Sequence, residues 1–184
     1  PPLLTKLPSL EALDLQSNQL AGALALPDAG LPNLRLLHLG NNQLSGGLPP
    51  GLFASTNLTH LILWANQLGG DLPAGLCSLA RLKVLGLSDN TFSGPLPTCL
   101  GNLAQLEELV LSSNQLYGPI PAELGRLAQL RILSLGRNLL SGSIPASLTN
   151  LAALRTLYLG GNNLSGPLPA GIGKLTNLES LVLW

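Results

Sequence analysis

The sequence predicts an α/β repeat solenoid, a fold in which one short unit is copied along the chain and the copies stack on one another. Three observations predict it: 52 of the 184 residues are leucine, 21 are glycine and 15 are proline, and these types recur at a fixed interval of 24 residues. Chains this rich in glycine and proline are often disordered. Disordered chains lack apolar side chains, however, and 46% of this chain is hydrophobic.

Seven asparagines mark the repeat, because each lies 24 residues after the one before. Each belongs to the frame L-x-x-L-x-L-x-x-N-x-L-x-G, as from Leu106 to Gly118, and from the second copy onward the frame continues x-(Leu or Ile)-Pro. An eighth copy begins at Leu175 and stops at Trp184. We therefore interpret residues 1–184 as a single array of seven copies and a partial eighth. The asparagine column is Asn18, Asn42, Asn66, Asn90, Asn114, Asn138 and Asn162.

The frame has a direct physical interpretation. The L-x-L segment alternates with period two, as a half-buried strand does, and one unit buries its leucines only by stacking, so the strands should form a parallel sheet. The asparagine amide offers donors and an acceptor to backbone groups left unpaired where the strand ends. Glycine at the next corner permits a left-handed backbone, and proline suits a short outer strand.

The first copy departs from the frame. Its proline, Pro27, lies two residues late, which places the outer strand after Leu24 in doubt. No unit with paired cysteines precedes Pro1, and no polar terminal unit follows Trp184. Because a solenoid with uncovered apolar ends would aggregate, we expect the array to be a fragment of a longer chain that continues at both ends.

The segment that begins Asn114-Gln-Leu-Tyr-Gly-Pro-Ile-Pro-Ala-Glu-Leu-Gly resembles the plant-type subclass of leucine-rich repeats almost position by position, and the resemblance covers essentially the whole chain. It implies a right-handed superhelix with a parallel sheet on the concave face. It also implies a second small sheet before the proline, and short 3-10 or loop returns on the convex face. Members are mostly extracellular receptor ectodomains and secreted inhibitors. We therefore expect an extracellular or cell-surface location, with an intracellular one as the alternative.

Composition excludes several classes of function. Nine basic and nine acidic residues give zero net charge, so no basic stripe is present for nucleic acid. No run approaches the ~18 apolar residues of a membrane helix, so we expect no membrane contact within this segment. Asp14, His38 and His60 are too few and too loosely placed for zinc, and no nucleophile faces the histidines. We expect no metal, no cofactor and no enzymatic activity.

The third, fifth and seventh frame positions should point away from the core, and there they are mostly small, neutral or apolar. The sequence predicts a partner-binding patch toward the N-terminus, where aromatic and aliphatic side chains lie beside hydrogen-bonding groups: His38, His60, Ile62 and Trp64. Tyr158, near Trp184, is a second candidate. The second frame position carries charges of both signs, Glu11 and Arg35 among them, and predicts a soluble edge of weak ion pairs.

The two cysteines and two glycosylation sequons bear on the compartment. Cys77 and Cys99 lie in consecutive return segments, two frame positions out of step. A disulfide between them would suit an oxidising compartment, but we expect unpaired thiols because the Cα separation risks exceeding ~7 Å. Asn57 and Asn163 each begin an N-x-S/T triplet outside the asparagine column, which leaves both available for glycosylation.

These features predict a protein- or peptide-recognition module of a leucine-rich repeat receptor-like protein, which binds through its concave or lateral face. The alternatives are a secreted inhibitor of a cell-wall-degrading enzyme and a structural scaffold. Some receptors of the family use an arginine pair to hold a peptide's terminal carboxylate. Here the nearest arginine, Arg137, lies beside Ser134 and Gly136, so that mode is unsupported.

Overall fold

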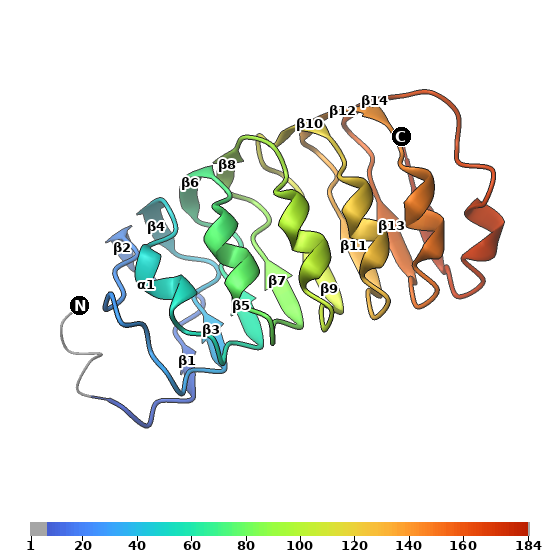
Figure 1. Ribbon diagram of the computed structural model, residues 1–184. Coiled ribbons are helices and arrows are strands. Elements are labelled where there is room, and N and C mark those ends of the chain that lie inside the picture. The colour runs from blue at the N-terminus through green and yellow to red at the C-terminus, as the bar shows by residue number, and fades with distance from the viewer. Residues whose placement is uncertain (1–6, 184) are drawn as a thin grey trace.

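The computed structural model describes residues 7–183, which form one stack of coils (Figure 1). Each coil contributes one strand to a sheet of eight parallel strands, as the sequence predicted, in the order β1-β3-β5-β7-β9-β11-β13-β15. The register advances by 24 residues per coil, so that Leu109 pairs with Leu85 and with Leu133. The inner strands are β1 (Ala12–Asp14), β3 (Leu36–His38), β5 (His60–Ile62), β7 (Val84–Gly86), β9 (Glu108–Val110), β11 (Ile132–Ser134), β13 (Thr156–Tyr158) and β15 (Ser180–Val182).

A second set of short parallel strands follows the inner strands, as the family resemblance implied. They form a four-stranded and a three-stranded sheet, which meet at a bridge between Pro95 and Tyr117. The outer strand of the first copy does form, because Ala21 to Ala23 pair with Gln43 to Ser45 despite the late proline. The strands are β2 (Ala21–Ala23), β4 (Gln43–Gly46), β6 (Gln67–Asp71), β8 (Thr91–Ser93), β10 (Tyr117–Pro119), β12 (Leu139–Ser143) and β14 (Asn163–Ser165).

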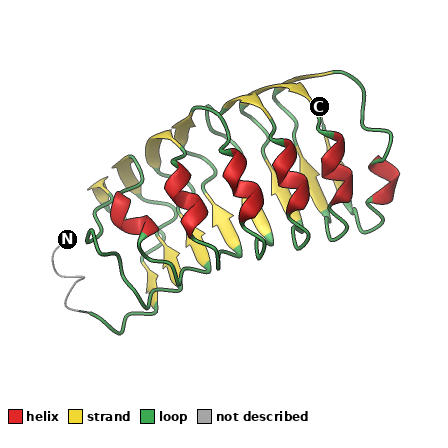
Figure 2. Ribbon diagram, viewed as in Figure 1, coloured by secondary structure: helices red, strands yellow, loops and turns green. Residues whose placement is uncertain are grey.

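The chain returns to the next coil through short helices, which Figure 2 shows as a row of red turns. Five of them begin directly after the frame proline, whose fixed φ suits the residue before a helix. The first copy, with its displaced Pro27, returns through turns instead. In the described residues no helix is both long and apolar enough to cross a bilayer. The helices are α1 (Pro50–Phe53) and the 3-10 helices η2 (Ala74–Ser78), η3 (Thr98–Asn102), η4 (Ala122–Arg126), η5 (Ala146–Asn150) and η6 (Ile172–Lys174).

Leucine fills the space between the sheets and the helices. The strand leucines Leu61, Leu85 and Leu109 are fully buried, and so are Leu76 and Leu100 from the return helices. Each fully buried leucine contributes roughly 1.5–3 kcal/mol relative to an exposed one. The core is therefore one continuous column that runs the length of the stack.

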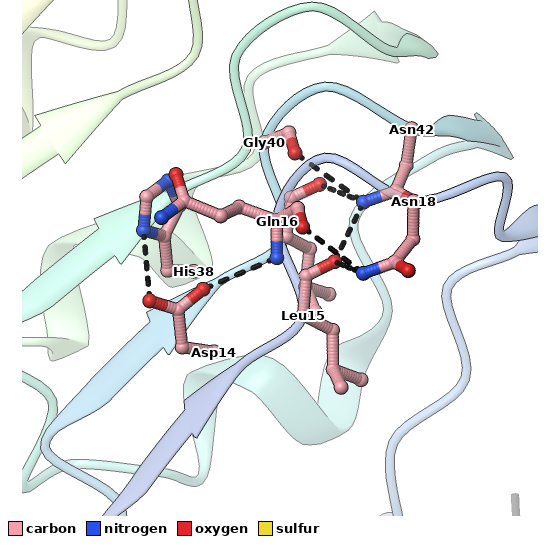
Figure 3. Close-up of polar contacts among 8 residues, drawn as sticks. Asp14, Leu15, Gln16, Asn18, His38, Gly40 and Asn42 are labelled. Atoms are coloured by element: carbon pink, nitrogen blue, oxygen red, sulfur yellow. Dashed lines mark hydrogen bonds and ion pairs between the residues drawn. The ribbon is translucent and has the colours of Figure 1, made fainter.

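The asparagine column joins each coil to the one before it. In the third coil, for example, the Asn66 amide nitrogen donates to the carbonyls of Leu63 (3.1 Å) and Trp64 (3.3 Å) in its own coil and of Leu39 (3.0 Å) in the preceding coil. Its oxygen accepts from the backbone N–H of Leu44 at 2.9 Å. Asn18 differs because no described coil precedes it, so its amide bonds only within its own coil and is exposed (Figure 3).

Two corners of every coil use a left-handed backbone. The residue before the ladder asparagine has φ between 50° and 57° in six copies, and glycine fills the equivalent position, Gly161, in the seventh. The predicted corner glycine after the asparagine also has positive φ in every copy, as at Gly118 (φ 79°). A side chain in this region costs roughly 1–2 kcal/mol, so the ladder bonds hold the first corner in place against that strain.

The cysteines correct the expectation of unpaired thiols. Cys77 in η2 and Cys99 in η3 form a disulfide, with Cα atoms 5.9 Å apart. A two-residue offset along a 3-10 helix is only about 4 Å, since the rise is ~2 Å per residue. Combined with an inter-coil step of ~4.8 Å, that offset gives roughly 6 Å, inside the range a disulfide spans.

The predicted charged edge is confirmed at the second frame position. Glu107 lies between two basic residues, Lys83 at 3.1 Å and Arg131 at 3.8 Å. Ion pairs also join Arg35 to Glu11 and Arg155 to Glu179. The paired side chains are one-third to two-thirds exposed, so each pair adds at most a few tenths of a kcal/mol.

We expect Asn90→Ala to cost about 3 kcal/mol in the free energy of unfolding. Asn90 is buried, and the change would leave the Leu68 N–H and the Leu63 carbonyl without partners. Asn18→Ala is the matched control and should cost less than about 1 kcal/mol, because water reaches the groups it bonds. Urea unfolding of both variants measures the difference. Equal costs would contradict the role given to the inter-coil bonds.

Replacing both Cys77 and Cys99 by serine should lower the free energy of unfolding by about 3 kcal/mol. The bond closes a loop with a sequence separation of 22 residues, and losing it frees the unfolded chain. Guanidinium unfolding with and without dithiothreitol measures the loss. Reductant should shift the wild type to the curve of the double variant and leave the variant unmoved. A variant as stable as the oxidised wild type would count against the bond.

Candidate functional site

The outer face of the eight-stranded sheet, which we call the concave face, carries the variable residues of the frame. In β3, β5, β9, β11 and β13 the central leucine is buried, and the residues on either side are half-buried. Successive side chains of a strand point to opposite faces, so the flanking residues point outward. Among the described outward positions only Asp14 and Glu108 are charged. The face is therefore close to neutral.

The structure brings the predicted N-terminal patch together: His38, His60, Ile62 and Trp64. His38 pairs in register with Ile62, and His60 lies on the same strand as Ile62. Trp64 follows two residues later and is half-buried. Its indole lies back over Gly40 of the preceding coil, where a Cβ atom would come within 2.6 Å of the indole nitrogen. Trp64 is thus a ring laid flat on a glycine, which keeps it in one orientation.

The two histidines of this patch are held differently. The Asp14 carboxylate lies 3.5 Å from His38 Nδ1 and also accepts the Gln16 backbone N–H at 3.1 Å (Figure 3). The His38 side chain is 15% exposed, and its Nε2 is buried with no hydrogen-bond partner among the described residues. His60 Nδ1 lies 2.9 Å from the Thr59 hydroxyl, whose hydrogen goes to the Arg35 carbonyl, so His60 is the donor.

Metal and nucleophile chemistry find little support around this pair. Between residues 7 and 183, no three His, Cys, Asp or Glu side chains converge as metal ligands would. The cysteines lie in return helices on the opposite side of the stack and are bonded to each other. The Asp14–His38 pair therefore offers a hydrogen-bonding group at the edge of the patch and no reactive centre.

Tyr158, the other predicted residue, lies far from this patch, on β13. Its ring rests on Gly136 of the preceding coil, where a Cβ atom would meet ring carbons at 2.5–2.8 Å. The ring forms one wall of an open hollow of about 420 Å³, which we call the C-terminal hollow. Sequence reasoning missed the other lining residues, because they become neighbours only across four coils: Val110, Ile132, Val182, Ser134, Thr156, Ser180 and Arg137.

A second, smaller asparagine ladder was also missed, and it bears on one glycosylation candidate. Asn33, Asn57 and Asn177 occupy the position before the first frame leucine, and each amide donates to a carbonyl 25 residues earlier. Asn57 thus bonds to the Pro32 carbonyl at 2.6 Å and is not the free side chain that we expected. Asn163 is exposed at the start of β14. The signal in the sequence was the recurrence of asparagine at one frame position in three copies.

Comparison with known proteins identifies the repeats. The chain matches a family model described as Leucine rich repeat over residues 56–116 and 122–164, and a second one of the same description over residues 33–54. No curated protein matches it.

Similar solved structures are plant receptors. One is the ectodomain of the membrane receptor kinase GASSHO1/SCHENGEN3 from Arabidopsis thaliana in complex with CASPARIAN STRIP INTEGRITY FACTOR 2, at 42% identity and a TM-score of 0.92, over 95% of this chain and 21% of that one. Another is the Arabidopsis receptor kinase HAESA in complex with the peptide hormone IDA and the co-receptor SERK1, at 35% identity and 0.91, over 95% and 29%. A third is a TDR receptor, at 39% and 0.95, over 98% and 31%. This chain therefore spans less than a third of the length of each of them.

The seat of the Trp64 ring can be tested with Gly40→Ala. In a Trp184→Phe background Trp64 is the sole tryptophan, and the new methyl group would displace its indole. We expect fluorescence at longer wavelength and a loss of about 1–3 kcal/mol in stability. Gly86→Ala is the control, because its Cβ would meet only Ile62, at 3.8 Å. An unchanged spectrum for Gly40→Ala would mean that the ring does not rest there.

Proposed function

Because the chain belongs to the plant-type leucine-rich repeat family, we propose that it is a recognition module of a receptor-like protein and binds a protein or peptide through its concave face. The observation that carries the proposal is the N-terminal patch. There a rigid aromatic ring lies among an aliphatic side chain and two histidines on a face with little charge. Hot spots of protein interfaces have this composition, in which a central aromatic is surrounded by groups that exclude water.

The orientation of Trp64 favours binding over mere tolerance of a surface aromatic. Because the indole is already fixed on Gly40, a partner that covers it immobilises few additional rotamers. His38 adds a buried Nε2 without a partner, which a donor on a ligand can satisfy. His60 offers its Nε2 beside the same ring. The patch thus combines apolar contact area with directional hydrogen bonding, and it has no group arranged for catalysis.

Two further observations support an extracellular setting for this function. The Cys77–Cys99 disulfide belongs to the class of bond that persists in oxidising compartments. Two of the similar structures hold a named peptide hormone or peptide factor, and both are ectodomains or receptors of membrane kinases. We extend that setting to this chain as part of the proposal, together with glycosylation at the exposed Asn163.

The test uses peptides selected on the wild-type chain from a library of random dodecapeptides. For peptides that bind, Trp64→Ala should weaken affinity by roughly thirtyfold, which corresponds to about 2 kcal/mol for a central anchor. Isothermal calorimetry measures affinity, and thermal melting checks that the variant is folded.

Tyr117→Ala is the matched control. Tyr117 is the other exposed aromatic of the middle coils, 52% exposed, but it lies in β10 of the second set of strands and not on the concave face. Its replacement should leave binding unchanged. Equal affinity of wild type and Trp64→Ala, with both folded, would overturn the proposed site. Loss of folding in Trp64→Ala would instead assign the ring a structural role.

A further inference from the structure

The C-terminal hollow differs from the N-terminal patch in its chemistry. Val110, Ile132 and Val182 present branched aliphatic groups, and the Tyr158 ring closes one side. Its volume of about 420 Å³ falls in the range of small-ligand sites, which is roughly 300–1,000 Å³. The hollow is open to solvent along the sheet. It is therefore suited to a side chain presented by an extended segment that lies across the strands.

One charge lines the hollow. Arg137 follows β11 in a left-handed conformation with φ 53°, and its stem lies against Gly161 of the next coil, where a Cβ atom would be 3.3 Å from Arg137 Cγ. The basic residues of the charged edge all have acidic partners, whereas Arg137 has no ion pair within residues 7–183. The nearest acid on the concave face of these strands is Glu108, at the opposite, amino-terminal end of β9. An unpaired guanidinium beside an apolar hollow complements a carboxylate.

The size of the hollow sets the length of its occupant. Its lining runs from β9 to β15, which is three steps of ~4.8 Å, or about 14 Å. An extended peptide advances ~3.3 Å per residue, so about four residues cross the hollow. Side chains two residues apart point to the same side. A segment that places an apolar side chain in the hollow therefore places the side chain two positions away near the same floor, within reach of Arg137.

We propose that the C-terminal hollow binds an extended peptide segment that carries an apolar residue and, two positions away, a carboxylate that pairs with Arg137. This rests on the proposed recognition function and names the ligand chemistry of a second region of the same face. The glycine under the tyrosine is part of the device: any side chain at Gly136 would force the Tyr158 ring to move and change the shape of the hollow.

The probes are capped peptides, acetyl-Gly-Ser-Leu-Ser-Asp-Ser-Gly-amide and the same peptide with leucine and aspartate exchanged, titrated into the full chain by methyl NMR. We expect one of the two to shift the methyl signals of Val110, Ile132 and Val182, with a Kd on the order of millimolar. Replacing its aspartate by asparagine, or its leucine by serine, should weaken binding about three- to tenfold. A third probe, which ends in a free carboxylate after Leu-Ser, distinguishes a terminal carboxylate from a side-chain one.

The variants locate the contacts. Arg137→Gln should weaken binding of the aspartate peptide to the level of its asparagine analogue, and Gly136→Ala should weaken all the probes. Arg155→Gln removes the same charge from the charged edge and should change nothing. Methyl signals that do not move, or equal affinity of the aspartate and asparagine peptides, would overturn the proposal. Trp64→Ala should not affect these probes, so failure here leaves the N-terminal patch as an independent question.

Discussion

One hydrogen-bonded side chain sets the geometry on which the other features depend. Each ladder asparagine after the first donates to a carbonyl of the preceding coil and accepts an N–H from it, so it fixes how two successive coils lie on each other. These bonds hold the neighbouring corner in a left-handed backbone that would otherwise be strained. An inserted or deleted residue between two asparagines would break both bonds. That constraint explains why the spacing stays at 24 through seven copies.

A fixed stagger has consequences for the concave face. Residues 24 apart become neighbours, and those 22 apart become diagonal neighbours, so the shape of a surface side chain depends on a residue in another coil. Trp64 rests on Gly40, and Tyr158 rests on Gly136. In both cases the glycine removes a Cβ that would lift the ring away from the sheet. Two separated regions of the face thus use the same device to present an aromatic ring in a single orientation.

The convex side serves a different purpose from the concave one. Its short helices bury leucines and expose polar residues, and the Cys77–Cys99 bond links two of them. The charged edge adds weak ion pairs along one flank. Because stability comes from the core, the ladder and this bond, the outward rows of the concave face vary at little cost to folding. That freedom is what allows a repeat protein to change its partner while keeping its fold.

The sequence by itself determined the repeat length, the parallel inner sheet, the outer strands and the outward rows, because periodicity of leucine, asparagine, glycine and proline specifies which residues face the core. It also identified Trp64 and the histidines as neighbours, since residues one repeat apart must lie side by side. Only the tertiary structure decided the disulfide between Cys77 and Cys99, the bond that holds Asn57, and the hollow around Tyr158 and Arg137. Each of these depends on distances and side-chain directions between coils. A pattern of residue types gives the order of the coils, but it does not give the offset and rotation of one coil against the next.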